Sequence, residues 1–145
     1  MSAALAGRRI VLALWAGALW TAGFVVAPML FATLEDRQLA GMLAGELFTA
    51  VAWLSVACLL LLGLFEYALQ GWMLLRRWTS ALIVVALLLS LVGELGVRPL
   101  MAAAVEAGDS GRFDLLHSVS ASLYLTTSAI ALALVAWREP GAGNG

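Results

Sequence analysis

The chain has 145 residues, of which 63% are hydrophobic and 12% charged, with a mean hydropathy of +1.00 and a formal net charge of -1. A soluble domain carries roughly 25% charged residues, so this chain has too little charge to cover a water-facing surface. The net charge argues against a nucleic-acid partner, which needs a basic patch. The single cysteine, Cys58, excludes a disulfide within the chain and a thiolate metal cluster, and we expect it to be a small buried hydrophobe. The composition and length therefore predict one domain, 1–145, with the lipid bilayer as its partner.

Four apolar runs follow one another, at residues 10–32, 42–65, 78–97 and 113–137. Each approaches or exceeds the roughly 20 residues that a helix needs to cross the hydrocarbon core of a bilayer. The runs show no strand-like alternation, and they are much longer than the strands of a membrane barrel, which have about 10 residues. The first run is also longer than the roughly 7–15 apolar residues of a signal peptide, so we expect it to be retained. The fold class predicted is all-α, an integral membrane four-helix bundle.

Three features interrupt or end these runs. Pro28, near the outer end of the first helix, removes the hydrogen bond to the carbonyl of Phe24, which either kinks the helix or helps to line a polar site. Pro99 is expected to end or bend the third helix, so that residues 100–107 form a short helix over the outer end of the bundle. The tail, 139–145, is expected to be disordered. The sequence shows no evident internal repeat.

The arginines predict the orientation, because Lys and Arg accumulate on cytoplasmic flanks. With four spans, the N-terminus, the second connection and the C-terminus share one side. That side holds five arginines against three on the other: Arg8, Arg9, Arg76, Arg77 and Arg138 against Arg37, Arg98 and Arg112. Indole rings settle at membrane interfaces, and four tryptophans fall at the same side: Trp15, Trp72, Trp78 and Trp137. We therefore expect both termini to be cytoplasmic, in a bacterial inner membrane.

This topology places ionisable side chains from three helices at a similar depth near the outer face. They are Glu46 on the second helix, Glu94 and Arg98 on the third, and His117 on the fourth. A charge in hydrocarbon costs at least about 2.5 kcal/mol, so such groups face the bundle interior and pair. Ser120 and Tyr124 share the face of His117. The predicted polar cluster is therefore His117, Glu94, Glu46, Arg98, Ser120 and Tyr124.

Other polar and small residues have simpler interpretations. Glu66 and Glu106 are expected to be solvated charges at the interface. Gly41 and Gly45 form a GxxxG pattern, which either lets the second helix approach a neighbour closely or arises by chance.

Several short motifs together resemble a known family. They are Trp15-x-Gly17, Gly23-Phe-Val-Val-Ala-Pro28-x-x-Phe31, Ala40-Gly41-x-x-x-Gly45-x-x-Phe48, Arg98-Pro99-Leu-Met101 and Phe113-x-x-x-His117-x-x-Ser120. In this combination the chain resembles domain of unknown function 4149, a family related to eukaryotic transmembrane protein 205. The resemblance implies a four-helix membrane protein and gives weight to Pro28, Phe31, Pro99, His117 and Ser120. Tyr124 stands where some members have asparagine, so a detailed hydrogen-bond network does not transfer.

Three functional interpretations remain open. In the first, the cluster binds or passes a small solute, a proton or a metal ion. Together with His117, three methionines could supply soft ligands for copper, although methionine in an apolar chain usually packs; they are Met29, Met42 and Met101. In the second, the protein is structural or an assembly partner, as a homo-oligomer or with another membrane protein, and the cluster only orients the helices. In the third, it is a haem-binding redox protein, for which the lone histidine offers one axial ligand per subunit. No cofactor and no enzymatic activity are predicted, because the sequence has no phosphate loop, no HExxH and no serine elbow.

Overall fold

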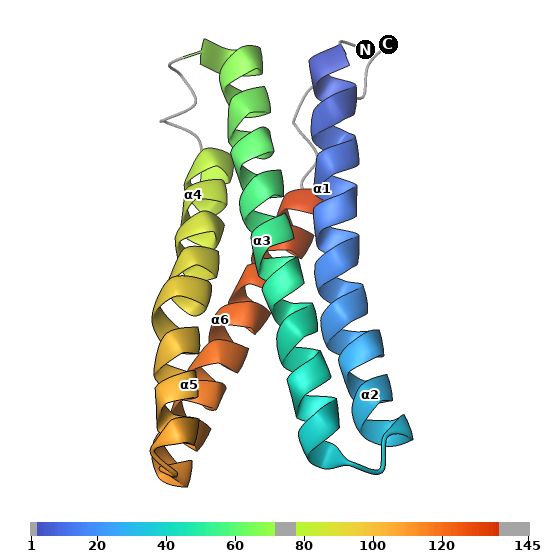
Figure 1. Ribbon diagram of the computed structural model, residues 1–145. Helices are drawn as coiled ribbons and strands as arrows, with labels where there is room; N and C mark the ends of the chain where they lie inside the picture. Colours follow the sequence, from blue (N-terminus) through green and yellow to red (C-terminus); the bar gives the residue numbers. More distant parts are fainter. Residues whose placement is uncertain (1–2, 72–77, 137–145) are drawn as a thin grey trace.

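The computed structural model describes residues 3–71 and 78–136, and every regular element in these ranges is helical. In chain order the elements are α1 (Ala3–Thr21), the π-helical segment η1 (Ala22–Val26), α2 (Ala27–Thr33), α3 (Arg37–Gln70), α4 (Trp78–Leu91), the π-helical segment η3 (Val92–Val97), α5 (Arg98–Glu106) and α6 (Ser110–Ala136). They join into four long rods, whose arrangement is shown in Figure 1. Each rod is long and apolar enough to cross a membrane: Ala3–Thr33, Arg37–Gln70, Trp78–Glu106 and Ser110–Ala136. The prediction of an all-α chain with four such helices is confirmed.

The rods extend beyond the apolar runs that predict them. The third rod continues through Pro99 to Glu106, so residues 100–107 do not form a separate helix over the bundle. The tail at 139–145, with Trp72, Arg76, Arg77, Trp137 and Arg138, lies outside the described residues.

Pro28 and Pro99 are accommodated by π-helical turns. The N–H of Ala27 donates to the carbonyl of Ala22, five residues earlier, and the N–H of Arg98 donates in the same way to Gly93. In both places the next residue is a proline, which has no N–H and whose ring collides with the carbonyl four residues before it. Widening the turn by one residue relieves that collision and lets the helix continue.

Two short turns connect the rods at the end of the bundle that lies away from the start of α1, here named the distal end. Asp36 caps α3, because its Oδ1 accepts hydrogen bonds from the backbone N–H groups of Gln38 and Leu39 at 2.8 and 3.1 Å. Gly108, with φ of 66°, ends α5 in the left-handed conformation that glycine adopts without strain. The two halves of the chain therefore share one plan: a rod with a π turn and a proline, a tight turn, and an unbroken helix.

The core lies toward the opposite end, here named the proximal end, where α1 begins and α3 ends. There α1 packs on α3 and α6, and α4 packs on α3 and α6. Trp15 is 0% exposed and sits in this core with Leu19, Leu59, Leu62 and Ile83. Its indole lies on the buried face of α1 and is enclosed by the bundle, whereas the prediction placed it among the tryptophans that face a membrane interface. Cys58 is buried, as expected.

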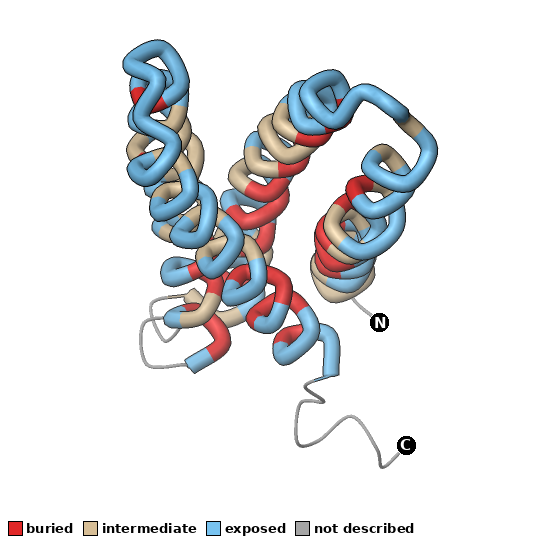
Figure 2. The backbone as a smooth tube through the Cα atoms, turned by 90° about the horizontal axis from the view of Figure 1, so that it is seen from below, coloured by how far each residue is buried: buried red, intermediate tan, exposed pale blue. Residues whose placement is uncertain are grey.

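Toward the distal end the bundle separates into two hairpins. There α2 packs on α3, and α5 packs on α6. In Figure 2, seen from the distal end, the α5–α6 hairpin stands apart from the α2–α3 hairpin. This divergence determines which of the predicted polar residues meet.

Candidate functional site

Arg98 is the centre of a polar cluster at the distal end. Its Nη1 donates to the backbone carbonyl of Gly45 at 3.1 Å, and its Nη2 donates to Oε1 of Glu46 at 3.2 Å. Its Nε lies 3.6 Å from Oε1 of Glu94, one turn earlier on the same rod. Arg98, Glu46 and Glu94, which we name the distal cluster, join the third rod to α3 where the hairpins begin to diverge.

The three side chains of the distal cluster differ in their exposure. The side chain of Glu94 is 14% exposed, that of Arg98 is 39% exposed and that of Glu46 is 77% exposed. An exposed ion pair contributes little to stability, because water screens it. Two carboxylates share one guanidinium, so the ionised cluster has one negative charge in excess, and Glu94 is the better shielded of the two.

His117 is not part of the distal cluster. It is exposed, and its ring stacks on that of Phe113 with centroids 6.0 Å apart. Among the described residues, no hydrogen bond or ion pair joins it to Glu46, Glu94 or Arg98. The prediction of a single site that includes the histidine is therefore not what the structure shows.

The reason lies in what the polar face of α6 meets: at Tyr124 it contacts the first rod and Phe48 of α3, and not Arg98. The hydroxyl of Tyr124, on this face, donates to the backbone carbonyl of Leu19, and its ring packs edge-on against Phe48 at 4.9 Å between centroids. His117 lies two turns further along the same face, beyond the point where α6 and the first rod diverge. Ser120, between them, is half-buried.

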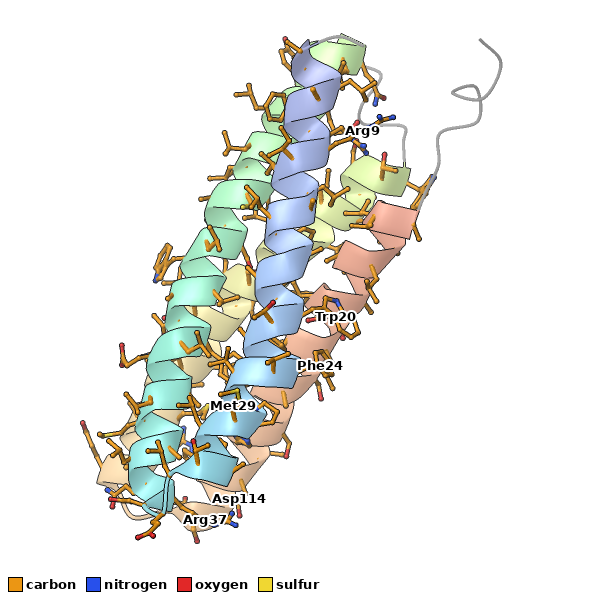
Figure 3. The ribbon with its side chains drawn as sticks, turned by 90° about the vertical axis from the view of Figure 1, so that its right-hand side faces the viewer. Arg9, Trp20, Phe24, Met29, Arg37 and Asp114 are labelled. Carbon is orange, nitrogen blue, oxygen red and sulfur yellow. The ribbon has the colours of Figure 1, made fainter. Side chains whose placement is uncertain are left out.

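A second contact between the first rod and α6 follows on the next turns. Trp20 donates from Nε1 to the backbone carbonyl of Ser128 at 3.4 Å, and its ring stacks on Phe24 with centroids 4.4 Å apart. Figure 3 shows Trp20, Phe24 and Met29 following one another along the first rod toward the distal end, with α6 beside them. Met29 and Met42 are exposed and Met101 is half-buried. In the described part of the chain, no group of three or more His, Cys, Asp and Glu side chains could hold a metal ion.

The glycine pattern on α3 does not mediate a close helix contact. A Cβ added at Gly41 or Gly45 would meet nothing within 4 Å. Close approaches are instead made by Gly23, where a Cβ would lie 2.6 Å from Cε1 of Tyr124, and by Gly7, where it would lie 2.7 Å from Cζ of Phe65. Phe31 and Pro28 are exposed on α2, and Pro99 is exposed on α5.

A second polar network lies at the proximal end, and the sequence reasoning missed it. Arg8 donates from Nε to Oε1 of Glu66 at 2.7 Å, and Gln70 donates from Nε2 to Oε2 of Glu66 at 2.5 Å. The side chain of Glu66 is 1% exposed, so the expectation of a solvated interfacial charge is wrong. We name Arg8, Glu66 and Gln70 the proximal network. Glu106 is exposed, as expected.

A signal for the proximal network was available in the spacing of α3. Leu59, Leu62 and Glu66 follow one another at helical intervals on a single buried face, and Gln70 lies one turn further. The interpretation failed because the apolar run stops at Phe65, whereas the buried face continues to Glu66 and the helix to Gln70.

The distal cluster, both prolines and Glu66 all lie within residues 10–110, and this segment matches the sequence pattern of a family described as Domain of unknown function (DUF4149). The chain belongs to the DUF4149 family. Most of α6, with His117, Ser120 and Tyr124, lies beyond the DUF4149 match, and Arg8 precedes it. A search of curated proteins and a search of solved structures both give no match.

The distal cluster and the proximal network differ in their balance of carboxylate and guanidinium groups. The proximal network pairs one carboxylate with one guanidinium, whereas the distal cluster pairs two carboxylates with one. Among the described residues, the distal cluster is therefore the more acidic of the two arrangements.

Proposed function

We propose that the chain is a multi-pass protein of a bacterial inner membrane, with both termini in the cytoplasm, and that its distal cluster binds a proton or another small cation near the outer face. The orientation follows from the arginines, since Arg8 and Arg9 lie at the proximal end and Lys and Arg accumulate on cytoplasmic flanks. The distal turns then face the outer side.

The observation that carries this proposal is the sharing of Arg98 by two carboxylates, one of which is shielded. Glu94, 14% exposed, lies 3.6 Å from the guanidinium, while the closer hydrogen bonds of Arg98 go to Gly45 and Glu46. The positive charge of the guanidinium therefore neutralises the negative charge of the Glu94 carboxylate only in part. Ionisable groups inside a membrane mark ion or proton sites, and a proton or a cation at Glu94 would neutralise the excess charge.

A structural role is the second candidate, and a specific contact favours it. Arg98 donates to a backbone carbonyl of α3, which ties the two hairpins together at the point where they diverge. Under this interpretation the carboxylates orient Arg98 and bind nothing else.

The variant Glu94→Gln separates the two candidates, because glutamine keeps the shape of the side chain and removes its charge. The control is Glu106→Gln, which removes an exposed carboxylate at the end of the same rod. Purified protein in detergent would be titrated with protons, Na⁺, Ca²⁺ and Cu(I), and binding followed by calorimetry and by thermal unfolding, since a ligand at 100 times its Kd stabilises by about 2.7 kcal/mol.

We expect the wild type and Glu106→Gln to bind one of these cations and Glu94→Gln to lose that binding while it remains folded. If the wild type binds none of them and Arg98→Ala separates the hairpins, the structural role is correct and the cation site is refuted.

A further inference from the structure

Several deeply buried polar atoms have no hydrogen-bond partner within the described part of the protein. They are Nε1 of Trp15, Oγ1 of Thr79, Oγ of Ser80, Oγ of Ser128 and Oε1 of Gln70. Trp15 is 0% exposed and Ser128 is 1% exposed, so neither reaches bulk solvent or lipid. Buried polar groups nearly always have a partner, and where the protein supplies none, the usual partner is an internal water molecule.

These atoms differ from the other hydroxyls of the bundle. Ser55 donates to the carbonyl of Val51 at 2.7 Å, Ser90 to that of Ala86 at 2.9 Å, and Thr127 to that of Leu123 at 2.9 Å. This bond to the carbonyl one turn earlier is open to any serine or threonine in a helix. Ser128 does not make it and has no other partner in the described residues, which leaves its hydroxyl group available to a partner in the interior.

The unpaired groups lie at two levels along the bundle axis. Tyr124 bonds the carbonyl of Leu19, and one turn from this pair toward the proximal end lie Ser128 on α6 and Trp15 on α1. These two antiparallel helices rise equally per residue, so Trp15 and Ser128 share a level in the middle of the bundle.

The second level is that of the proximal network. Arg98 contacts Gly45, so these two residues lie at one level of the bundle. Counting the same number of residues from each of them toward the proximal end reaches Ser80 on α4 and Gly63 on α3. Gly63 is within one turn of Glu66. Thr79 and Ser80 are both buried. Their hydroxyl groups therefore lie within about one helical turn of the depth of Glu66. The unpaired oxygen of Gln70 belongs to the residue one turn further toward the proximal end.

Other hydroxyl groups lie between these levels and the distal cluster. Ser90 is one turn before Glu94 on the third rod, and Ser55 and Thr127 are buried in the middle of the bundle. A hydroxyl that donates to its own helix still accepts hydrogen bonds. From Ser80 to Glu94 the third rod rises by about 21 Å, which is the length of roughly eight water molecules in hydrogen-bond contact.

We propose that a file of internal water molecules runs through the bundle from the proximal network to the distal cluster, and that protons pass along it. The proposal rests on the proposed function in one respect, since it takes the distal cluster as the outer end of the file. The proximal network, with Arg8 and Glu66, is the inner end. Trp15 and Ser128 hold the water in the middle, where the surrounding core is otherwise apolar.

The water file is tested first by labelling with hydroxyl radicals, which X-ray pulses generate from water next to a side chain. The protein is the wild type in detergent, and oxidation is read by mass spectrometry. We expect Trp15 to be oxidised although it is fully buried, and Leu62, also buried, to remain unmodified after correction for intrinsic reactivity. An unmodified Trp15 would overturn the proposal.

Proton movement is tested in liposomes that enclose a pH-sensitive dye. After a pH step, we expect Ser128→Ala to conduct protons about fivefold more slowly than the wild type, which corresponds to about 1 kcal/mol. The control Ser122→Ala removes an exposed serine of the same helix, and we expect it to match the wild type. Ser80→Ala serves as the second test variant if Ser128→Ala does not fold.

Equal rates for the buried-serine variants and the control would overturn the proposal. The two proposals fail separately. Loss of cation binding in Glu94→Gln tests the distal cluster, whereas labelling of Trp15 does not depend on Glu94.

Discussion

Gly23 is the position where adding one methyl group should disturb the bundle most directly. A Cβ at Gly23 would lie 2.6 Å from Cε1 and 2.9 Å from the hydroxyl oxygen of Tyr124. The ring cannot move aside freely, because its hydroxyl is bonded to the carbonyl of Leu19 and its edge packs on Phe48. The variant Gly23→Ala must therefore displace the ring and weaken that hydrogen bond.

The expected cost follows from these two effects. Overpacking of a well-packed contact costs about 1–3 kcal/mol, and the hydrogen bond adds about 1 kcal/mol. Replacing glycine by alanine in a helix returns about 1 kcal/mol. The net effect expected is a loss of about 2 kcal/mol of unfolding free energy in Gly23→Ala.

The assay is equilibrium unfolding in mixed micelles, followed by tryptophan fluorescence. The control is Gly17→Ala on the same rod, where a Cβ would meet nothing within 4 Å and which should be neutral or slightly stabilising. In Tyr124→Ala, the added effect of Gly23→Ala should fall to that of the control. The reasoning is refuted if Gly23→Ala is as stable as Gly17→Ala, or if its cost is unchanged when the tyrosine is absent.

Two further predictions concern the ion pairs. Arg8→Met should destabilise the protein by about 3–5 kcal/mol, because it leaves the buried carboxylate of Glu66 without its positively charged partner. The double variant with Glu66→Leu should recover most of this loss. The same unfolding assay measures both variants, and equal stability of Arg8→Met and wild type would contradict the buried pairing. Glu46→Gln should change the free energy of unfolding by less than about 1 kcal/mol, because the contact of Glu46 with Arg98 is exposed. A larger loss would show that this ion pair contributes substantially to the stability of the fold.

The sequence predicts the four rods well, because the thickness of a bilayer sets a minimum length for an apolar helix. It also indicates which residues share a face of one helix, as with His117, Ser120 and Tyr124. It does not indicate which neighbour that face meets. The structure places Tyr124 against the first rod and Phe48. Among the described residues, His117 makes no hydrogen bond or ion pair with Arg98.

Glu66 shows a second limit. A prediction from hydropathy places the end of a membrane-spanning helix at the first charged residue after an apolar run. Arg8, which neutralises Glu66, lies in a different run and gives no local signal. The pairing of Arg98 with Glu46 also depends on tertiary structure, but there both residues could be placed at one depth from the topology alone.

The shared plan of the two halves bears on how such a chain can arise. Each half consists of a rod, a distal turn and a return helix, so it begins and ends at the same end of the bundle. A duplicated half joined to its copy would keep the same direction without inverting, and parallel repeats of this kind occur in membrane transporters. The π turns before Pro28 and Pro99 would then be corresponding features of the two halves.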